Sequence, residues 1–201
     1  MVATPDRFEE LQKVISSLRK YHKEPICVMV GEGKVQAHEF KTMCGILTPF
    51  DRTIMMDIDM LVLQNFGEVF DLLKTYDIAL HDETKWGTYN SGLIAFNKDF
   101  MKEVSDLWYY KYLEKKFDKK KGWKGIYDQD ILTDILKRKN EIKISKHQIY
   151  NLSKFYNYCI YRYTAAEEIE DWDHIKVLHY WMGSNNKPDL ERKAWKIWKE
   201  G

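Results

Sequence analysis

Two aspartates separated by one residue follow an apolar, β-prone run at residues 53–56. Because successive side chains of an extended strand point to opposite faces, this spacing predicts that Asp57 and Asp59 point the same way and that Ile58 points into a core. Two carboxylates on one face repel each other, unless a divalent cation lies between them and a phosphate. The pair therefore predicts a metal site at the C-terminal end of a strand.

The same Asp-x-Asp spacing occurs twice more, so the motif depends on its context. About one such pair is expected by chance in a chain of this composition. Asp128 and Asp130 lie at the expected start of a helix, where the helix macrodipole favours acidic residues, so stability alone would explain them. Asp171 and Asp173 are predicted to lie in a solvated loop.

A histidine and a lysine near the C-terminus extend the candidate site. His179 ends a predicted strand and is followed by a loop that contains Gly183 and Lys187. Mg²⁺ accepts carboxylate and phosphate oxygens, and an added imidazole shifts the preference toward Mn²⁺. Lys187 would neutralise a diphosphate as a point charge. A lone histidine is more often an ordinary hydrogen-bonding residue, so His179 depends on the aspartates for its assignment as a ligand.

Strands and helices alternate along the chain, and these elements must position the candidate residues. This alternation is typical of an α/β domain with a largely parallel sheet. The first helix is predicted to follow Thr4 and Pro5, and Thr4 has the alternative role of a helix cap. A turn followed by a strand is predicted over 89–96, and further strands are predicted at 25–30, 53–63, 77–80, 141–145 and 175–180. Helices are predicted at 5–21, 36–47, 65–73, from Asp99, from Asp128 and at 190–199.

Length and composition fit one globular domain over residues 1–201. Hydrophobic residues make up 44% and charged residues 31% of the chain, and the net charge of +1 predicts no nucleic-acid partner. No apolar run reaches the length of a membrane span, although the Trp/Lys segment 195–199 would suit a peripheral membrane contact. Three widely spaced cysteines and the lack of a signal-peptide pattern predict a cytoplasmic location.

Five short motifs, in the same order along the chain, resemble the GT-A glycosyltransferases. The likeness is closest to the glycogenin-like group of retaining galactosyl- and glucosyltransferases, and it spans nearly the whole chain. It implies a GT-A fold, with a central, mostly parallel mixed sheet flanked by helices. The motifs are residues 41–65 around Asp57-Ile-Asp59, Thr4-Pro-Asp6, Tyr89-Asn-Ser-Gly92, Tyr127-Asp-Gln-Asp-Ile-Leu132, and His179-Tyr-Trp-Met-Gly183 with Lys187-Pro188.

The resemblance also implies a role for each matching residue. Asp57, Asp59 and His179 would hold Mn²⁺ or Mg²⁺ against the diphosphate of a nucleotide sugar. The remaining implied contacts are Thr4 and Asp6 with the nucleoside, Gly183 and Lys187 with the diphosphate, Lys41 with phosphate or sugar, and Asp82, Asn90, Ser91, Asp128 and Gln129 with the donor sugar. Asp130 would stabilise the oxocarbenium ion or act as a transient nucleophile.

The activity implied is metal-dependent transfer of a hexose from a UDP-sugar, with retention, to a saccharide, protein or lipid-linked acceptor. Two alternatives stay open. One is a metal-dependent nucleotidyl- or phosphotransferase built on the same aspartate pair, and the other is a carbohydrate-binding relative without turnover. The Asn-Ser-Gly and Asp-Gln motifs favour sugar transfer, since phosphoryl transfer requires neither.

Overall fold

The computed structural model describes residues 1–83, 87–117, 128–137, 148–160, 165–180 and 188–200. The helices are α1 (Phe8–Tyr21), α2 (Lys34–Thr42), α3 (Cys44–Leu47), α4 (Val69–Leu72), α5 (Lys98–Phe117), α6 (Asp128–Lys137) and α7 (Pro188–Glu200). The strands are β1 (Val2–Ala3), β2 (Met29–Val30), β3 (Arg52–Met56), β4 (Met60–Val62), β5 (Ile78–Glu83), β6 (Thr88–Asn97), β7 (Ile149–Asn151), β8 (Tyr158–Cys159) and β9 (Val177–His179).

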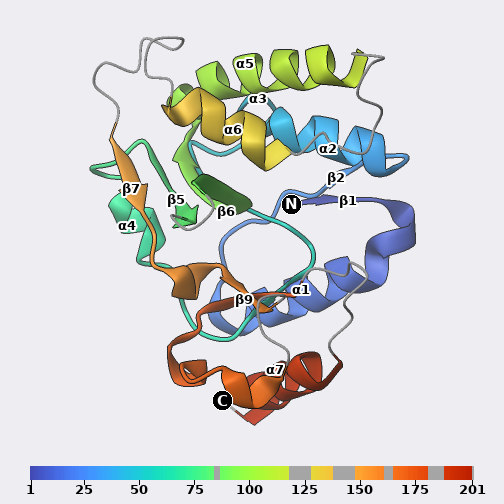
Figure 1. Cartoon of the computed structure of the whole chain (residues 1–201), viewed down its shortest axis with the longest axis vertical. Coiled ribbons are helices and arrows are strands. Elements are labelled where there is room, and N and C mark those ends of the chain that lie inside the picture. The colour runs from blue at the N-terminus through green and yellow to red at the C-terminus, as the bar shows by residue number, and fades with distance from the viewer. Residues whose placement is uncertain (84–86, 118–127, 138–147, 161–164, 181–187, 201) are drawn as a thin grey trace.

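Helices cover both faces of a central four-stranded sheet with the order β3-β6-β5-β7 (Figure 1). Helices α3, α5 and α6 pack on one face, with α2 beside them, and α1 packs on the other. A two-stranded sheet (β1-β2) and a three-stranded sheet (β4-β9-β8) adjoin it, and α7 lies at the far end next to the three-stranded sheet. This α/β layering matches the predicted fold class.

The pairing within the sheets is mixed, and less parallel than expected. β6 runs antiparallel to both β3 and β5, and β9 runs antiparallel to β4. Parallel pairing joins β1 to β2, β5 to β7 and β8 to β9. β5 ends at Glu83 and β6 begins at Thr88. The connection is too short for the crossover that parallel neighbours need, so these strands form a hairpin.

Alternating side chains of the central strands build two cores. Ile78, Leu80 and Phe96 contribute to the core beneath α5 and α6, whereas Ala79 and Ala95 contribute to the core beneath α1. All five are fully shielded from solvent. Because both faces are covered, these strands read as continuous apolar runs in the sequence rather than as alternating ones.

The predicted strand over residues 53–63 is broken at the aspartate pair. β3 ends at Met56, and β4 begins at Met60 in a different sheet. The amide of Asp57 still donates to the Gly92 carbonyl, at 2.8 Å, which continues the pairing with β6. Two residues later along the chain, the Asp59 carbonyl accepts from the Tyr180 amide, at 3.0 Å, which starts the pairing with β9. The chain therefore passes from one sheet to another at residues 57–59.

Several other elements are shorter than predicted. The helix expected at 36–47 is divided at Met43 into α2 and α3, where a Cβ on Gly45 would lie 2.3 Å from the Met101 carbonyl oxygen of α5. The strand expected at 25–30 is limited to Met29–Val30, and the Val30 side chain is exposed. The helix expected at 65–73 is limited to α4, and the strand expected at 141–145 lies outside the described residues.

The first helix begins after a short 3₁₀ turn, η1 (Pro5–Arg7), which Thr4 precedes. The Thr4 side chain makes no capping hydrogen bond, so helix capping does not explain this residue. None of the helices within the described ranges combines the length and the apolar character that a membrane span requires.

Candidate active site

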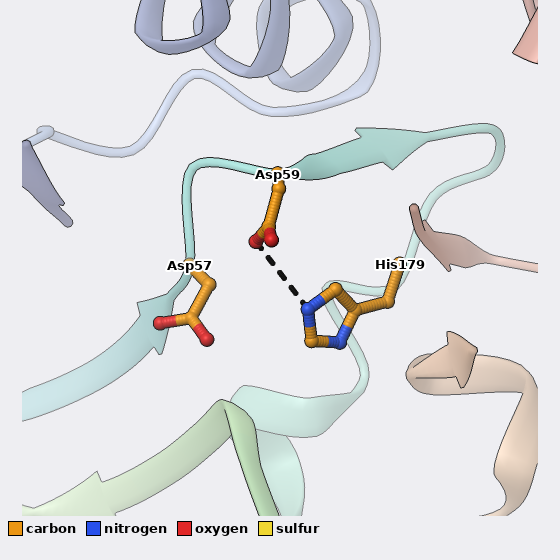
Figure 2. Close-up of side chains that lie close together, drawn as sticks. All are labelled: Asp57, Asp59 and His179. Atoms are coloured by element: carbon orange, nitrogen blue, oxygen red, sulfur yellow. Dashed lines mark ion pairs between the residues drawn. The ribbon is translucent and has the colours of Figure 1, made fainter. Parts of the chain in front are cut away.

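Asp57, Asp59 and His179 converge where the two larger sheets meet (Figure 2). Each offers one ligand atom, and the three atoms lie within 4.8 Å of one another. The Nε2 atom of His179 lies 3.3 Å from Oδ1 of Asp59. The register of β4 and β9 pairs Met60 with His179, which brings the histidine beside the aspartates although 120 residues separate His179 from Asp59. Figure 2 shows the imidazole directed between the two carboxylates.

The two carboxylates approach each other by a route that differs from the expected one. The sequence predicted an extended strand in which both side chains share a face. Asp57 instead follows the end of β3, and Ile58 and Asp59 lie in a bend that leads into β4. The bend, rather than the two-residue period of a strand, places the carboxylates together (Figure 2).

Lys41 of α2 links the cluster to α6. Its buried ammonium lies 2.9 Å from each carboxylate oxygen of Asp57 and 3.0 Å from Oδ2 of Asp128. Burial alone would lower the pKa of Lys41, but the carboxylates of Asp128 and Asp57 outweigh burial and raise it. The ammonium therefore stays charged and holds two carboxylates from different elements in one arrangement.

The pKa values of the three residues in the cluster are shifted in different directions. Burial raises the pKa of Asp57, and Asp59 adds to the shift, although Lys41 opposes it. Burial would also raise the pKa of Asp59, but the neighbouring His179 lowers it. Burial would lower the pKa of His179, and Asp59 overcomes this and raises it. Negative charge that is desolvated and incompletely balanced is the electrostatic setting that a divalent cation stabilises.

An irregularity in β6 positions the predicted Asn-Ser-Gly motif. Leu80 of β5 pairs with Ile94, whereas the next residue, His81, pairs with Asn90, so residues 91–93 lie outside the regular register with β5. Such bulges redirect side chains near active sites. The motif lies within the strand, and not in a turn before it as predicted, because residues 88–97 pair with β5 and β3.

The start of α6 is fixed against this bulge. Oγ of Ser91 donates to Oδ2 of Asp128, at 2.9 Å, and the Ser91 amide donates to Oε1 of Gln129, at 3.4 Å. Burial would raise the pKa of Asp128, but Lys41 and the Ser91 hydrogen bond keep it low. Unlike Asp128 and Gln129, Asp130 has an exposed side chain on the first turn of α6. Asp128 is therefore a fixed, ionised carboxylate, and it shares the Lys41 ammonium with Asp57.

The remaining predicted residues are more dispersed. Oδ1 of Asp82 is buried and has no hydrogen-bond partner among the described residues, although the backbone amide of Asp82 donates to Asn151. Thr4 is buried directly after β1, and Asp6 is exposed on η1. Gly183 and Lys187 lie outside the described residues.

Sequence reasoning missed a polar network behind His179. Nδ1 of His179 lies 2.9 Å from Oδ1 of Asn157, and Nδ2 of Asn157 donates to Oδ1 of Asn90, at 2.6 Å. Asn90 in turn donates to Oε1 of Glu83, at 2.8 Å. Cys159, which pairs with His179 across β8 and β9, lies 3.7 Å from Nδ1. Asn157 lies in an aromatic stretch without periodicity, so no local signal marked it.

The donor set at the cluster suits a divalent cation. Two carboxylates and one imidazole are ligands of Mn²⁺ and of related ions. A carboxylate has about four lone-pair positions, so Asp57 can accept from Lys41 and still bind a cation. Oδ1 of Asp82 is a buried acceptor without a hydrogen-bond partner among the described residues, so it can accept from a bound molecule. Asp57, Asp59 and His179 would hold the ion.

Comparison with known proteins gives a consistent result at the level of the fold. No family model matches the sequence, and no curated protein matches it. Among solved structures, the glycosyltransferase GlyE of Streptococcus pneumoniae TIGR4 superimposes with a TM-score of 0.66 and 18% identity over 98% of this chain. This chain spans about 60% of the length of GlyE.

Two further structures extend the comparison. The galactosyltransferase LgtC, solved with donor and acceptor sugar analogs, has a TM-score of 0.57 and 14% identity, with 100% of this chain and 96% of LgtC covered. Mouse xyloside xylosyltransferase 1 has a TM-score of 0.53 and 11% identity, with 92% and 98% covered. Likeness at these identities concerns the fold, and the chain has the GT-A fold of the glycosyltransferases.

Proposed function

We propose that this protein is a metal-dependent glycosyltransferase that moves a hexose from a UDP-sugar to an acceptor with retention. The observation that carries the proposal is the convergence of Asp57, Asp59 and His179 at the junction of two sheets in a GT-A fold. These side chains would hold Mn²⁺, or Mg²⁺, beside the diphosphate of the donor. A carboxylate pair with an imidazole favours Mn²⁺ of the two ions.

The reaction separates a diphosphate from the anomeric carbon, where positive charge develops. The bound cation would supply the charge that stabilises the leaving diphosphate. We assign Gly183 and Lys187 to the diphosphate, and Thr4 and Asp6 to the nucleoside, from their positions in the family-like motifs. Buried groups oriented before the reaction stabilise developing charge more strongly than solvent does.

The sugar-facing side of the proposed site is formed by β6, α6 and β5. Asp128 is fixed by Lys41 and Ser91, so its charge is oriented without further reorganisation. The unpaired Oδ1 of Asp82 offers an acceptor to a sugar hydroxyl. Asn90 is buried behind the bulge, where it supports the position of Gly92.

Gln129 and Asp130 are the proposed residues next to the reacting carbon. Gln129 is held by the Ser91 amide and by Thr88, to which its Nε2 donates at 3.3 Å. Asp130 follows on the same helical turn and is open to solvent. We assign Asp130 the stabilisation of the oxocarbenium ion or a transient nucleophilic role. Retention would follow from either a double displacement or a same-face internal return.

The neighbours by fold support a sugar-transfer activity and indicate the class of acceptor. LgtC was solved with donor and acceptor sugar analogs, and the other two structures are a glycosyltransferase and a xylosyltransferase. By this analogy, the acceptor of this chain is a saccharide, free or linked to protein or lipid. The cytoplasm, where nucleotide sugars are present, is the proposed location.

A panel of nucleotide sugars tests the proposal. The purified protein is incubated with UDP-, GDP- and ADP-hexoses, with Mn²⁺ or with EDTA, and the melting temperature and the free nucleotide are measured. We expect a Mn²⁺-dependent rise in melting temperature with a UDP-hexose, and a slow release of UDP. The absence of metal-dependent binding of every donor would overturn the proposal.

The same assay separates the two alternatives. Release of phosphate or pyrophosphate from a nucleoside triphosphate, without turnover of any nucleotide sugar, would identify a phospho- or nucleotidyltransferase. Binding of saccharides without turnover of any donor would identify a carbohydrate-binding relative.

A further inference from the structure

The hydrogen bonds behind His179 determine which ring nitrogen faces the aspartates. Nε2 lies beside Asp59, and Nδ1 lies 2.9 Å from Oδ1 of Asn157. Asn157 is 2% exposed, so water does not compete for this contact. The partner of one imidazole nitrogen sets the role of the other, because a neutral imidazole has one donor and one acceptor.

A backbone amide fixes the direction of every hydrogen bond in this chain of contacts. The Gly92 amide can only donate, and it donates to Oδ1 of Asn90, at 2.8 Å. The same oxygen is 2.6 Å from Asn157, which must therefore present its NH₂ group to Asn90. The carbonyl oxygen of Asn157 then faces Nδ1 of His179, so Nδ1 carries a hydrogen.

The imidazole ring is also confined from the side by β6. A Cβ on Gly92 would lie 2.6 Å from Cε1 and 2.8 Å from Nδ1 of His179. The ring therefore lies directly against the Gly92 backbone, in the space that the missing side chain leaves. Gly92 thus contributes both the amide that orients the asparagines and the surface that holds the ring.

We infer that Asn157 is a positioning residue for the proposed metal site: it accepts from Nδ1–H of His179 and thereby presents the Nε2 lone pair to a cation held by Asp57 and Asp59. The inference rests on the proposed function, because it assumes that the cluster binds a metal. Metal-bound histidines commonly donate their second N–H to such an acceptor, and losing that acceptor weakens metal affinity about 10- to 100-fold.

Two substitutions at Asn157 separate positioning from packing. Asn157→Leu keeps the branching at Cγ but removes both hydrogen bonds, so we expect the Kd for Mn²⁺ to rise about 10- to 100-fold. Asn157→Asp keeps an oxygen acceptor for Nδ1–H, but it replaces the donation to Asn90 with an unfavourable contact between two oxygens, which lowers stability. We expect this variant to recover most of the Mn²⁺ affinity even where its melting temperature is lowered. The Kd is measured by the electron paramagnetic resonance signal of free Mn²⁺.

Asn97→Leu is the matched control for lost hydrogen bonds. Nδ2 of Asn97 donates to the carbonyls of Leu73 and Tyr76, at 3.0 and 3.1 Å, from the opposite end of β6. We expect this variant to lose stability with no change in the Kd for Mn²⁺. If Asn157 had a purely structural role, its Asp and Leu variants would lose melting temperature and keep the Kd for Mn²⁺, as we expect of Asn97→Leu.

A spectroscopic measurement on the unmodified chain avoids dependence on variant folding. Cd²⁺ enriched in ¹¹³Cd serves as a diamagnetic substitute for Mn²⁺ in protein labelled with ¹⁵N-histidine. We expect one-bond ¹¹³Cd–¹⁵N coupling to Nε2 of His179 and a slowly exchanging hydrogen on Nδ1. Coupling to Nδ1, or a Mn²⁺ affinity of Asn157→Leu within twofold of the parent chain, would overturn the inference. If the parent chain binds neither ion, the proposed function itself fails.

Discussion

At the scale of single residues, three Asp-x-Asp pairs have the same spacing but very different surroundings. Asp57 and Asp59 face a histidine and a buried lysine. Asp128 bonds to Ser91 and Lys41. Asp171 lies directly before the turn η6 (Trp172–His174) and forms an ion pair with the exposed Lys154, at 3.2 Å. Among the described residues, only the first pair provides two carboxylates and an imidazole within reach of one ion. The group that each aspartate faces therefore indicates its role better than the spacing does.

The substitution Asp59→Asn tests this difference directly. The amide keeps the size of the side chain but removes the charge that faces His179. We expect Mn²⁺ binding and Mn²⁺-dependent release of UDP to fall at least about 100-fold, because the amide offers the cation a neutral oxygen in place of a charged one. Isothermal titration calorimetry with Mn²⁺ and circular dichroism measure affinity and folding together. Asp171→Asn is the matched control, and an equal loss in both variants would contradict a metal role for Asp59.

Gly92 offers a second test at this scale, since its Cα lies against the His179 ring. In Gly92→Ala the new methyl group would lie 2.6 Å from Cε1 of His179 and 2.8 Å from Cε of Met60. Contacts this short force neighbours to move, which costs about 1–3 kcal/mol of stability. We expect both a lower melting temperature and weaker Mn²⁺ binding, measured by thermal denaturation and by calorimetry.

Gly33→Ala is the control for replacing a glycine. Among the described residues outside its chain neighbours, no atom lies within 4 Å of a Cβ built on Gly33, and its φ of −168° is ordinary extended backbone. We expect a small loss of stability at the start of α2 and an unchanged affinity for Mn²⁺. Full Mn²⁺ affinity in Gly92→Ala would show that the His179 ring does not need this space.

At the scale of elements, an exposed ionic contact connects α4 to the segments that carry β8 and β9. Glu68, directly before α4, accepts from the Tyr156 hydroxyl at 2.7 Å and from the Lys176 ammonium. Tyr156 ends the turn η3 (Lys154–Tyr156) before β8, and Lys176 precedes β9. The contact therefore involves the residue directly before Asn157 and the residue directly before the strand that ends in His179.

The substitution Glu68→Gln is expected to show a defined pH dependence. Burial would raise the pKa of Glu68, but hydrogen bonds from Lys176 and Tyr156 lower it below the ordinary value of 4.5. A carboxylate with a lowered folded-state pKa stabilises the fold above 4.5, and this stabilisation is lost as the pH falls through the folded pKa. The parent chain should therefore melt higher than Glu68→Gln at pH 7, and the difference should vanish in acid.

The size of this effect is limited by solvent. Glu68 is 44% exposed, so screening keeps the contribution below about 1 kcal/mol, or a few degrees in melting temperature. Glu200→Gln, which breaks only the exposed pair with Lys196, is the control and should not change the melting temperature. A difference for Glu68→Gln that is equal at pH 7 and pH 3 would assign the effect to packing instead of charge.

The elements also show which features could be predicted from the sequence. The apolar periods of α1, α5 and α6 and the apolar runs of β3, β5 and β6 are local signals, so these elements and the α/β class were predicted. The break at residues 57–59 was not, because it depends on the Asp57 amide pairing with Gly92 and the Asp59 carbonyl pairing with Tyr180. Both partners are distant in the sequence, and local propensity carries no information about them.

The same reasoning applies to the candidate site. The chemistry of carboxylates and imidazole is visible in residue types, so Asp57, Asp59 and His179 could be selected from the sequence. Asn157 could not be selected, because its role arises only when β8 pairs with β9. The salt bridge of Lys41 to Asp128 is likewise a tertiary contact between α2 and α6. Residue types thus indicated the chemistry, whereas the supporting partners required the three-dimensional pairing.

At the scale of the whole molecule, the candidate metal site lies between two sheets that share part of one core. Asp57 follows β3 of the four-stranded sheet, whereas His179 ends β9 of the three-stranded sheet. Met60 and Val177 of the three-stranded sheet contribute to the core beneath α1, whereas Leu178 contributes to a third core that includes α7. A cation bound by all three ligands would therefore hold the two sheets together.

Addition of Mn²⁺ is expected to stabilise both sheets at once. Binding at 100 times the Kd adds about 2.7 kcal/mol, which corresponds to a rise in melting temperature of roughly 5–10 °C for a chain of this length. Hydrogen exchange locates the effect, because the amides of Asp57 and Tyr180 are bonded within different sheets, to Gly92 and to Asp59. We expect Mn²⁺ to slow exchange at both amides in the parent chain and at neither in Asp59→Asn. Slower exchange at the Asp57 amide alone would mean that the ion is held by the carboxylates without His179, and that the two sheets are not coupled through it.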